Sequence, residues 1–336
     1  MSVDGDTARS RSSSGGAAKV PHRVGAVVRA ERVVVVRKTT SMERLGTRRS
    51  SKLAQLVAAQ DPLADRVQAA HAEHVRTLAE VEHVLRERGI EFRVVPNFTR
   101  PLAAWADLVV TVGGDGTFLR ASHSIQPGKD SDGPPMLGVN SAASSSVGYF
   151  CAARCEDFAT VLDQVLAGEV RSRGLWRLEV SVNGKPLRDL ALNDVLLAHR
   201  VPAETTRYVL SVDDAVQEQK SSGIWVATAA GSTAAIRSAG GQVLDIDDQR
   251  IQYRVRELML WPLSGAPLTG GLVTGKIEVT SRMSTGVLYI DGGHQRVAFG
   301  FGDCIAFRGA SRPMPWVAPT SLEQRREAWL SVAPRD

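Results

Sequence analysis

Residues 107–117 have the sequence Asp-Leu-Val-Val-Thr-Val-Gly-Gly-Asp-Gly-Thr, an apolar run that ends in three glycines around one carboxylate. Short apolar runs bounded by turn residues are typical of strands buried on both faces of a parallel sheet. The stretch from Thr117 to His123 is compatible with a helix. A strand that passes through a glycine-rich loop into a helix predicts a doubly wound α/β domain, in which ligands bind beyond the carboxyl ends of the strands. Gly113 to Thr117 is at such an end.

The residues around this unit continue the alternation of strand and helix. Further strands are predicted over residues 32–37, which include four consecutive valines, and over residues 91–95 and 136–139. Between the first two, residues 52–88 have apolar side chains at helical spacing, and Gly89 follows as a C-terminal cap. We therefore predict a Rossmann-like α/β domain over residues 31–145.

After residue 146 the pattern changes to short β-prone segments separated by turn residues. Asn183-Gly184, Asp213-Asp214 and Asp291-Gly292-Gly293 each follow a run rich in Val, Leu, Ile or Tyr. Such pairs between two strand-like runs are strong hairpin signals. They predict a mostly antiparallel β domain over residues 146–305. Residues 306–336, which include a charged helical stretch, are expected to return to the N-terminal domain.

The positive charge of the chain is concentrated at its N-terminus. The net charge is +5, yet residues 1–60 hold 12 Lys and Arg against 4 Asp and Glu, so the remainder is slightly acidic. A basic excess confined to a Ser- and Arg-rich end favours a solvated tail over a nucleic-acid-binding face. Residues 1–30 are thus predicted to be a disordered basic tail, with an organelle transit peptide as the alternative, although Asp4 and Asp6 disfavour it.

The remaining composition excludes several classes of protein. No apolar run approaches the length of about 20 residues that a membrane span needs. Three cysteines are too few for a disulfide framework and lack neighbouring ligands for zinc. His71 and His74 lie one helical turn apart, but without a further ligand a solvated helix face is the preferred interpretation. We expect no resident metal, no membrane partner and no nucleic-acid partner, in a cytoplasmic protein.

The segment Gly113-Gly114-Asp115-Gly116-Thr117 carries the strongest chemical signal. Glycines allow backbone conformations closed to other residues and expose N–H groups to a phosphate chain. A carboxylate beside phosphates is unfavourable unless it takes a proton or helps to hold Mg²⁺, so Asp115 is the candidate catalytic residue. The alternative is a tight turn that only connects a strand to a helix. The segment matches neither the Walker loop nor the dinucleotide fingerprint.

Two later segments have side chains suited to a dinucleotide. Asn193 and Asp194 offer an amide and a carboxylate, which pair with ribose hydroxyls and a carboxamide, although a simple turn is an equal alternative. Residues 231–235 are all small, so their backbone can approach a flat ring or a pyrophosphate closely. The alternative for this segment is a close-packed helix start.

Together these motifs resemble a known family. Gly-Gly-Asp-Gly-Thr is the signature of a kinase superfamily that includes NAD kinases, diacylglycerol and sphingosine kinases and, more distantly, phosphofructokinases. Residues 191–195 look like the Asn-Glu/Asp motif of NAD kinases, and residues 222–241 resemble their second glycine-rich loop. All three motifs occur in the family's order, and the similarity covers residues 32–307. The chain is similar to the NAD kinase family, most of all to plant-type NADH kinases and more weakly to mitochondrial NAD kinases.

The resemblance implies ATP-dependent phosphorylation of the 2′-hydroxyl of the adenosine ribose of NADH or NAD⁺. Asp115 would be the general base, and Mg²⁺ would accompany ATP as the cofactor. The residues implied at the ATP phosphates are Gly113, Gly114, Gly116 and Thr117. Those implied at NAD(H) are Asn193, Asp194, Thr233, Ala234, Ala235 and Ser238. The family also implies a homodimer or a higher homo-oligomer.

Several residues depart from the common bacterial pattern. Asp194 replaces a Glu, Ser222 an Asp, Ala229-Ala230 a Pro-Thr pair, and Ala235 a Tyr. These substitutions put the adenine contacts in doubt and are shared by the plant-type NADH kinases, which implies acceptance of NADH. Two alternatives stay open: a lipid or sugar kinase that shares the first motif, and a non-catalytic NAD(H)-binding sensor.

Overall fold

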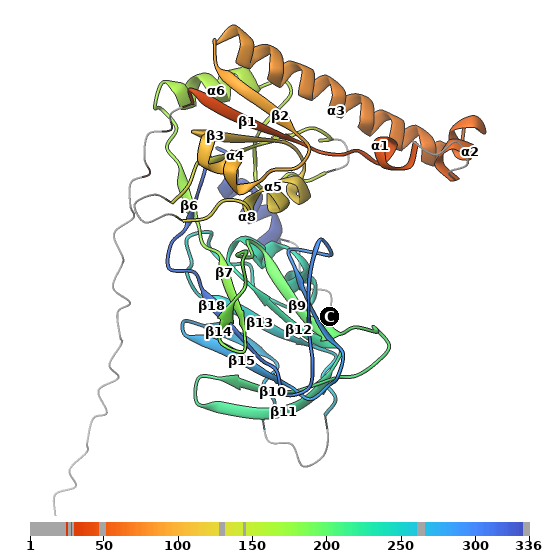
Figure 1. The fold of residues 1–336 in the computed structure, drawn as a ribbon, viewed down its shortest axis with the longest axis vertical. Coiled ribbons are helices and arrows are strands. Elements are labelled where there is room, and N and C mark those ends of the chain that lie inside the picture. The colour runs from red at the N-terminus through yellow and green to blue at the C-terminus, as the bar shows by residue number, and fades with distance from the viewer. Residues whose placement is uncertain are drawn as a thin grey trace, which may run out of the picture.

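The computed structural model describes residues 25, 28, 30–46, 52–127, 132–143, 146–260 and 266–331. It has an α/β part built on a seven-stranded sheet and a β part built on two six-stranded sheets (Figure 1). The basic tail expected over residues 1–30 lies outside the described residues, except for residues 25, 28 and 30. Within the described ranges no helix is both long and apolar enough to cross a membrane.

The sheet of the α/β part is parallel except at one edge. Its order is β2-β1-β3-β4-β19-β6, β5 also pairs with β4, and only β6 runs antiparallel to its neighbour. The strands are β1 (Arg32–Arg37), β2 (Glu91–Val95), β3 (Leu108–Gly113), β4 (Met136–Asn140), β5 (Cys151–Arg154), β6 (Arg173–Leu175) and β19 (Met314–Trp316). The strands predicted over residues 32–37, 91–95, 107–112 and 136–139 are confirmed.

Helices cover both faces of this sheet, which is why its central strands are apolar on both sides. Val34 and Val36 of β1 pack in one buried cluster with α4, α5 and α8, and Val33 and Val35 pack in another with α3 and α6. The helices are α1 (Ser41–Gly46), α2 (Lys52–Ala58), α3 (Pro62–Glu87), α4 (Arg100–Trp105), α5 (Asp115–Ser122), α6 (Phe158–Leu166) and α8 (Leu322–Ser331).

The prediction of one helical stretch over residues 52–88 is wrong in one respect, because the structure has two helices there, α2 and α3. Gln60 has a positive φ of 52°, which ends α2. Asp61 then caps α3 by accepting a hydrogen bond from the N–H of Leu63 at 2.9 Å, and Pro62 occupies the first turn, where its missing N–H costs nothing. The far end is as predicted: Gly89 follows α3 with a φ of 65°.

The β part consists of two antiparallel sheets. One has the order β11-β10-β15-β18-β7-β8 and the other β14-β13-β12-β9-β16-β17. The strands are β7 (Leu178–Val182), β8 (Lys185–Pro186), β9 (Asp194–His199), β10 (Thr206–Val212), β11 (Ala215–Ser221), β12 (Gly223–Ala227), β13 (Ile251–Arg256), β14 (Gly270–Val273), β15 (Lys276–Ser281), β16 (Gly286–Ile290), β17 (Gln295–Phe299) and β18 (Cys304–Gly309). Asn183, Asp213 and Asp291 have positive φ in the hairpin turns predicted for them.

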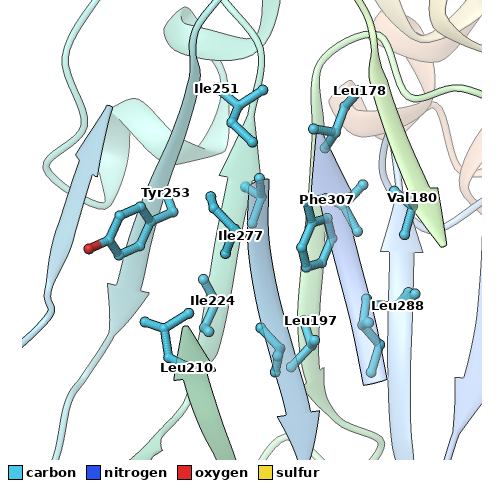
Figure 2. Close-up of a cluster of buried hydrophobic side chains, with 14 of the residues drawn as sticks. Leu178, Val180, Leu197, Leu210, Ile224, Ile251, Tyr253, Ile277, Leu288 and Phe307 are labelled. Atoms are coloured by element: carbon cyan, nitrogen blue, oxygen red, sulfur yellow. The ribbon is translucent and has the colours of Figure 1, made fainter. Parts of the chain in front are cut away.

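The two sheets pack face to face over a single apolar core (Figure 2). Phe307 and Ile277 reach the core from the first sheet, and Leu197, Ile224 and Leu288 reach it from the second, all fully buried. Residues from alternate positions of these strands fill the space between the sheets. The predicted fold class, an α/β domain followed by a mostly antiparallel β domain, is confirmed.

The division between the two parts differs from the expected one. The predicted boundary at residue 145 is too early, because β5, α6 and β6 belong to the first part and its sheet extends to Leu175. Strand β18 still belongs to the β part and ends at Gly309. The chain then returns to the first sheet through β19, where Trp316 pairs with Met136 of β4.

Candidate active site

The loop of residues 113–117 lies between the carboxyl ends of three neighbouring strands. Gly113 is the last residue of β3 and pairs with Asn140 of β4. On the other side, the N–H of Lys38, just beyond β1, donates to the carbonyl of Val112 at 2.9 Å. Helix α5 begins directly after the loop. This is the sheet edge at which α/β domains bind ligands.

Lack of space, and not backbone conformation, favours glycine at residues 113 and 114 of this loop. None of Gly113, Gly114 and Gly116 has a positive φ, so the expectation that they adopt conformations closed to other residues is wrong. A Cβ on Gly113 would lie 2.3 Å from Oγ1 of Thr117, and one on Gly114 would lie 2.5 Å from Oγ of Ser146. Among the described residues, a Cβ on Gly116 would meet nothing within 4 Å. The described part of the chain thus gives no reason for a glycine at 116, which suits a position that a ligand approaches.

Asp115 is the first residue of α5, and backbone N–H groups hold its carboxylate. Oδ2 accepts from the N–H of Tyr149 and Oδ1 from the N–H of Phe150, each at 2.9 Å. The position at a helix N-terminus also favours negative charge. Each carboxylate oxygen keeps a second lone pair, so Asp115 can still accept a proton from a hydroxyl group.

Thr117 is buried and supports the loop from below. It is 4% exposed, and its Oγ1 lies where a Cβ of Gly113 would otherwise be. Gly116 is exposed beside it. Of the four residues implied at the ATP phosphates, Gly116 therefore offers the open surface, while Thr117 packs beneath the loop.

The segment of residues 192–194 is held by one carboxylate from another strand end. Oδ1 of Asp291 accepts from the N–H groups of Asn193 and Asp194 at 2.7 and 3.1 Å, and Oδ2 accepts from that of Leu192 at 2.8 Å. The fourth partner is Nε2 of His123, the C-cap residue of α5, at 2.7 Å. A carboxylate with four partners rigidly fixes the backbone of this segment.

Asn193 and Asp194 are largely buried, and each has unused hydrogen-bonding capacity. Oδ1 of Asn193 is inaccessible and has no partner among the described residues. Asp194 is 5% exposed. Burial, together with the negative charge of Asp291, raises the pKa of its carboxyl to about 7. An orphaned amide oxygen and a carboxyl kept partly protonated are suited to hydrogen bonds with a polar ligand.

The second glycine-rich segment packs directly on this one. It forms a short 3₁₀ helix η1 (Ala230–Thr233) and α7 (Ala235–Ser238). A Cβ on Gly231 would lie 2.1 Å from the carbonyl oxygen of Asn193, so only glycine fits there. Thr233, Ala234 and Ala235 are partly exposed and Ser238 is exposed, so the four residues implied at NAD(H) here are accessible.

The two parts of the molecule meet at these segments. Leu192 and Ala230 of the β part belong to the same buried cluster as Phe118 of α5 and Phe150 of the loop that holds Asp115. A helix rises about 1.5 Å per residue, so α5 separates Asp115 from His123 by about 12 Å. The predicted catalytic carboxylate and the predicted dinucleotide segments therefore occupy opposite ends of one short helix.

His74 differs from the sequence-based interpretation. We expected a solvated helix face for His71 and His74, but His74 is 2% exposed and its Nδ1 lies 2.8 Å from Oγ of Ser141, whose N–H donates to Gly113. Burial, together with the positive charge of Lys38, lowers the pKa of His74 to about 4. His74 thus supports the strand end beside the loop as a neutral imidazole.

Sequence reasoning missed Asp291 as a site residue. Its turn sequence indicated a hairpin, which is confirmed, but nothing local shows that the side chain folds back to residues 192–194. His123, at the end of α5, has no motif of its own in the sequence, and only the folded chain shows its contact with Asp291.

A parallel sheet that carries a Gly-Gly-Asp-Gly-Thr loop, joined to a β part of two sheets, defines a class of two-domain phosphotransferases. Residues 24–170 match the family model described as the ATP-NAD kinase N-terminal domain. A probable NADH kinase of Oryza sativa subsp. japonica is 34% identical over 74% of this chain and 82% of its own length. The chain belongs to the NAD kinase family.

Two further comparisons agree with this assignment. The mitochondrial NAD kinase 2 of Rattus norvegicus is 28% identical over 61% of this chain and 59% of its own length, so the weaker likeness to mitochondrial enzymes is confirmed. The crystal structure of an NAD kinase from Archaeoglobus fulgidus in complex with ATP superposes with a TM-score of 0.65 at 22% identity, covering 90% of this chain and 100% of the other. That superposition supports the fold.

Proposed function

We propose that this chain transfers the terminal phosphoryl group of ATP to the 2′-hydroxyl of the adenosine ribose of NADH or NAD⁺, giving NADPH or NADP⁺. One observation carries the proposal: Asp115 lies at the N-terminus of α5, and the C-terminus of the same helix docks on the segment that contains Asn193 and Asp194. The family assignment supports it, and the names of the relatives include both NADH kinase and NAD kinase.

Asp115 supplies the base in this proposal. Its two backbone hydrogen bonds fix the plane of the carboxylate. A free lone pair on one carboxylate oxygen accepts the proton of the ribose hydroxyl while the hydroxyl oxygen attacks the γ-phosphorus, and the bond from that phosphorus to the leaving ADP breaks. General-base catalysis of this kind typically contributes 10²- to 10⁴-fold.

The donor phosphates would lie over the loop and the first turn of α5. The first N–H groups of a helix have no intrahelical partners and bind anions. Within the described residues no three Asp, Glu, His or Cys side chains gather as a metal site. A single carboxylate at the loop suits Mg²⁺ that is held mainly by the nucleotide phosphates, where it would neutralise charge.

The acceptor would lie against the β part. The residues proposed to contact it are Asn193, Asp194, Thr233, Ala234, Ala235 and Ser238. Asn193, which is partly exposed, contributes its amide group and Asp194 its carboxyl group, while Ala234 and Ala235 leave the backbone accessible. The small side chains favour a flat ring or a pyrophosphate at this surface. They also argue against the long apolar cleft that a lipid kinase requires.

The deciding experiment incubates the purified protein with Mg-ATP and either NADH or NAD⁺ and measures NADP(H) in a coupled enzymatic assay. We expect product from at least one dinucleotide, and Asp115→Asn should lower kcat at least about 100-fold. Asp163→Asn, an exposed carboxylate of α6 that pairs with Arg88, is the matched control and should retain activity. Binding by calorimetry without product would favour the NAD(H) sensor.

Oligomeric state and compartment are proposals that rest on the family resemblance and the composition. A homodimer or a higher homo-oligomer is expected in solution, and light scattering after size-exclusion chromatography tests it. A cytoplasmic location is expected, and a fusion to a fluorescent protein tests it.

A further inference from the structure

The C-terminal helix α8 reaches back to the loop that holds Asp115. Nη1 of Arg325 donates to the carbonyl oxygens of Gly148, Tyr149 and Cys151 at 2.6, 3.0 and 3.0 Å. Its Nε donates to Oγ of Ser321 at 3.0 Å, which fixes the guanidinium plane. One side chain of α8 thus binds three backbone carbonyls in a segment more than 170 residues away in the sequence.

Two of these carbonyls belong to the peptide groups that bind Asp115. The carbonyl of Gly148 and the N–H of Tyr149 form one peptide group, and the carbonyl of Tyr149 and the N–H of Phe150 form the next. Arg325 donates to both carbonyls, while both N–H groups donate to Asp115. Each peptide dipole is therefore aligned between a positive guanidinium and a negative carboxylate, and hydrogen bonds in such chains strengthen one another.

A second residue near the C-terminus, Trp316, also binds this segment. Nε1 of Trp316, in β19, donates to the carbonyl of Phe150 at 2.9 Å. The ring of Phe150 stacks on that of Phe118 of α5 at 5.1 Å between centroids. With its carbonyls fixed by Arg325 and Trp316, the segment of residues 148–151 presents its N–H groups to Asp115 from a rigid support.

Electrostatics act through the same contacts. Arg325 is partly buried, and burial lowers the pKa of its guanidinium, while the negative charge of Asp115 acts in the opposite direction. The two charges therefore influence each other across the peptide groups, in surroundings where water screens them less than at a free surface.

We propose that Arg325 is a positioning residue for the phosphoryl transfer, which acts on Asp115 through the two peptide groups of residues 148–150. It touches neither donor nor acceptor in this role. The inference rests on the proposed function, because it assigns Arg325 to the reaction in which Asp115 is the base.

The test is a double-mutant cycle in the full-length chain. Arg325→Ala should lower kcat about tenfold, with the KM for ATP and the KM for the dinucleotide changed less than about twofold, as expected of a residue in one network with the base. In an Asp115→Asn background the same substitution should lower the residual kcat by less than about twofold. Arg325→Lys keeps a cation that reaches some of the carbonyls and should recover part of the loss.

The matched control for Arg325→Ala is a second arginine, which lies in the β part. Arg308→Ala removes an exposed arginine that pairs with Glu179 in the β part and should leave kcat unchanged. An equal loss from Arg325→Ala in both backgrounds, or a loss confined to KM, would overturn the inference. So would unchanged kcat in a variant that is folded by circular dichroism. If Arg325→Ala does not fold, the cycle is run with Arg325→Lys. An inactive wild type would instead refute the proposed function.

Discussion

His123 and Asp291 form a 2.7 Å hydrogen bond that joins the two parts of the molecule. His123 caps the C-terminus of α5, whose first residue is Asp115, and Asp291 holds the backbone N–H groups of residues 192–194. Both side chains are buried. These hydrogen bonds connect the segment proposed to bind the dinucleotide to the helix that carries the proposed base.

Asp291→Asn tests this connection. The amide keeps the size of the carboxylate but has a single acceptor oxygen, so it cannot accept hydrogen bonds from all four of the groups that bind Asp291. We expect the free energy of unfolding to fall by about 1–3 kcal/mol and the KM for the dinucleotide to rise roughly tenfold. Urea denaturation and steady-state kinetics measure the two effects.

Asp303→Asn is the matched control for that substitution. Asp303 also accepts from a backbone N–H, that of Gly300, and from a side chain, that of Asn183, but in an exposed turn of the β part. It should leave the KM for the dinucleotide unchanged. An equal rise in both variants would show that Asp291 has no special connection to the acceptor segment.

Alanine substitutions at Gly113 and Gly116 should separate stability from activity. A methyl group on Gly113 meets Thr117 at 2.3 Å, so Gly113→Ala should lower the free energy of unfolding by about 1–3 kcal/mol. Gly116 lies in α5, and no described residue comes within 4 Å of an added Cβ, so Gly116→Ala should leave stability unchanged or raise it by up to about 1 kcal/mol.

Activity should follow a different order. The methyl group at residue 116 would occupy the open surface proposed for the donor phosphates, so Gly116→Ala should raise the KM for ATP about tenfold in a fully stable protein. Thermal unfolding together with ATP titrations measures both quantities. Full activity in Gly116→Ala would show that the phosphates do not approach this residue.

The sequence predicted the elements whose signals are local. The four valines of β1, the apolar run of β3 and the turn residues at Asn183 and Asp291 each determine their structure within a few positions. The boundary at residue 145 failed because β5 and β6 have only four and three residues. Strands this short have no clear periodicity, and they are strands only because neighbours in the sheet pair with them.

The candidate site was predictable to the same extent. Asp115, Asn193 and Asp194 stand in recognisable motifs, whereas the residues that hold them do not. Asp291 bonds to His123 across 168 positions, and Arg325 to Gly148 across 177. In the sequence Asp291 is an aspartate in a turn, and Arg325 is one of several charged residues on a helix. Their roles cannot be predicted from the sequence, because only folding brings their partners close to them.

His74 should make the protein less stable in mild acid. Its pKa is about 4 in the folded chain against 6.5 when unfolded, so below pH 6.5 the unfolded state binds the proton first. Its contribution to stability is therefore present above pH 6.5 and is lost as the pH falls toward 4. His74→Gln, which does not titrate, should flatten that loss in urea denaturation series between pH 4 and 7, whereas an unchanged slope would contradict the burial of the neutral imidazole.

Asp194 should have the opposite effect on stability over nearly the same pH range. Its pKa is raised from 3.8 in the unfolded chain to about 7, so between these values the folded state keeps a proton that the unfolded state has released. Stability from this group is present below pH 3.8 and is lost as the pH rises through 7. Asp194→Asn removes the titration but keeps the shape, and the difference between wild type and variant isolates this carboxyl because His74 is common to both. The free energy of unfolding should therefore fall more steeply between pH 4 and 7 in the wild type than in the variant. Equal slopes would mean that Asp194 is ionised throughout and that its carboxyl meets the dinucleotide only as an acceptor.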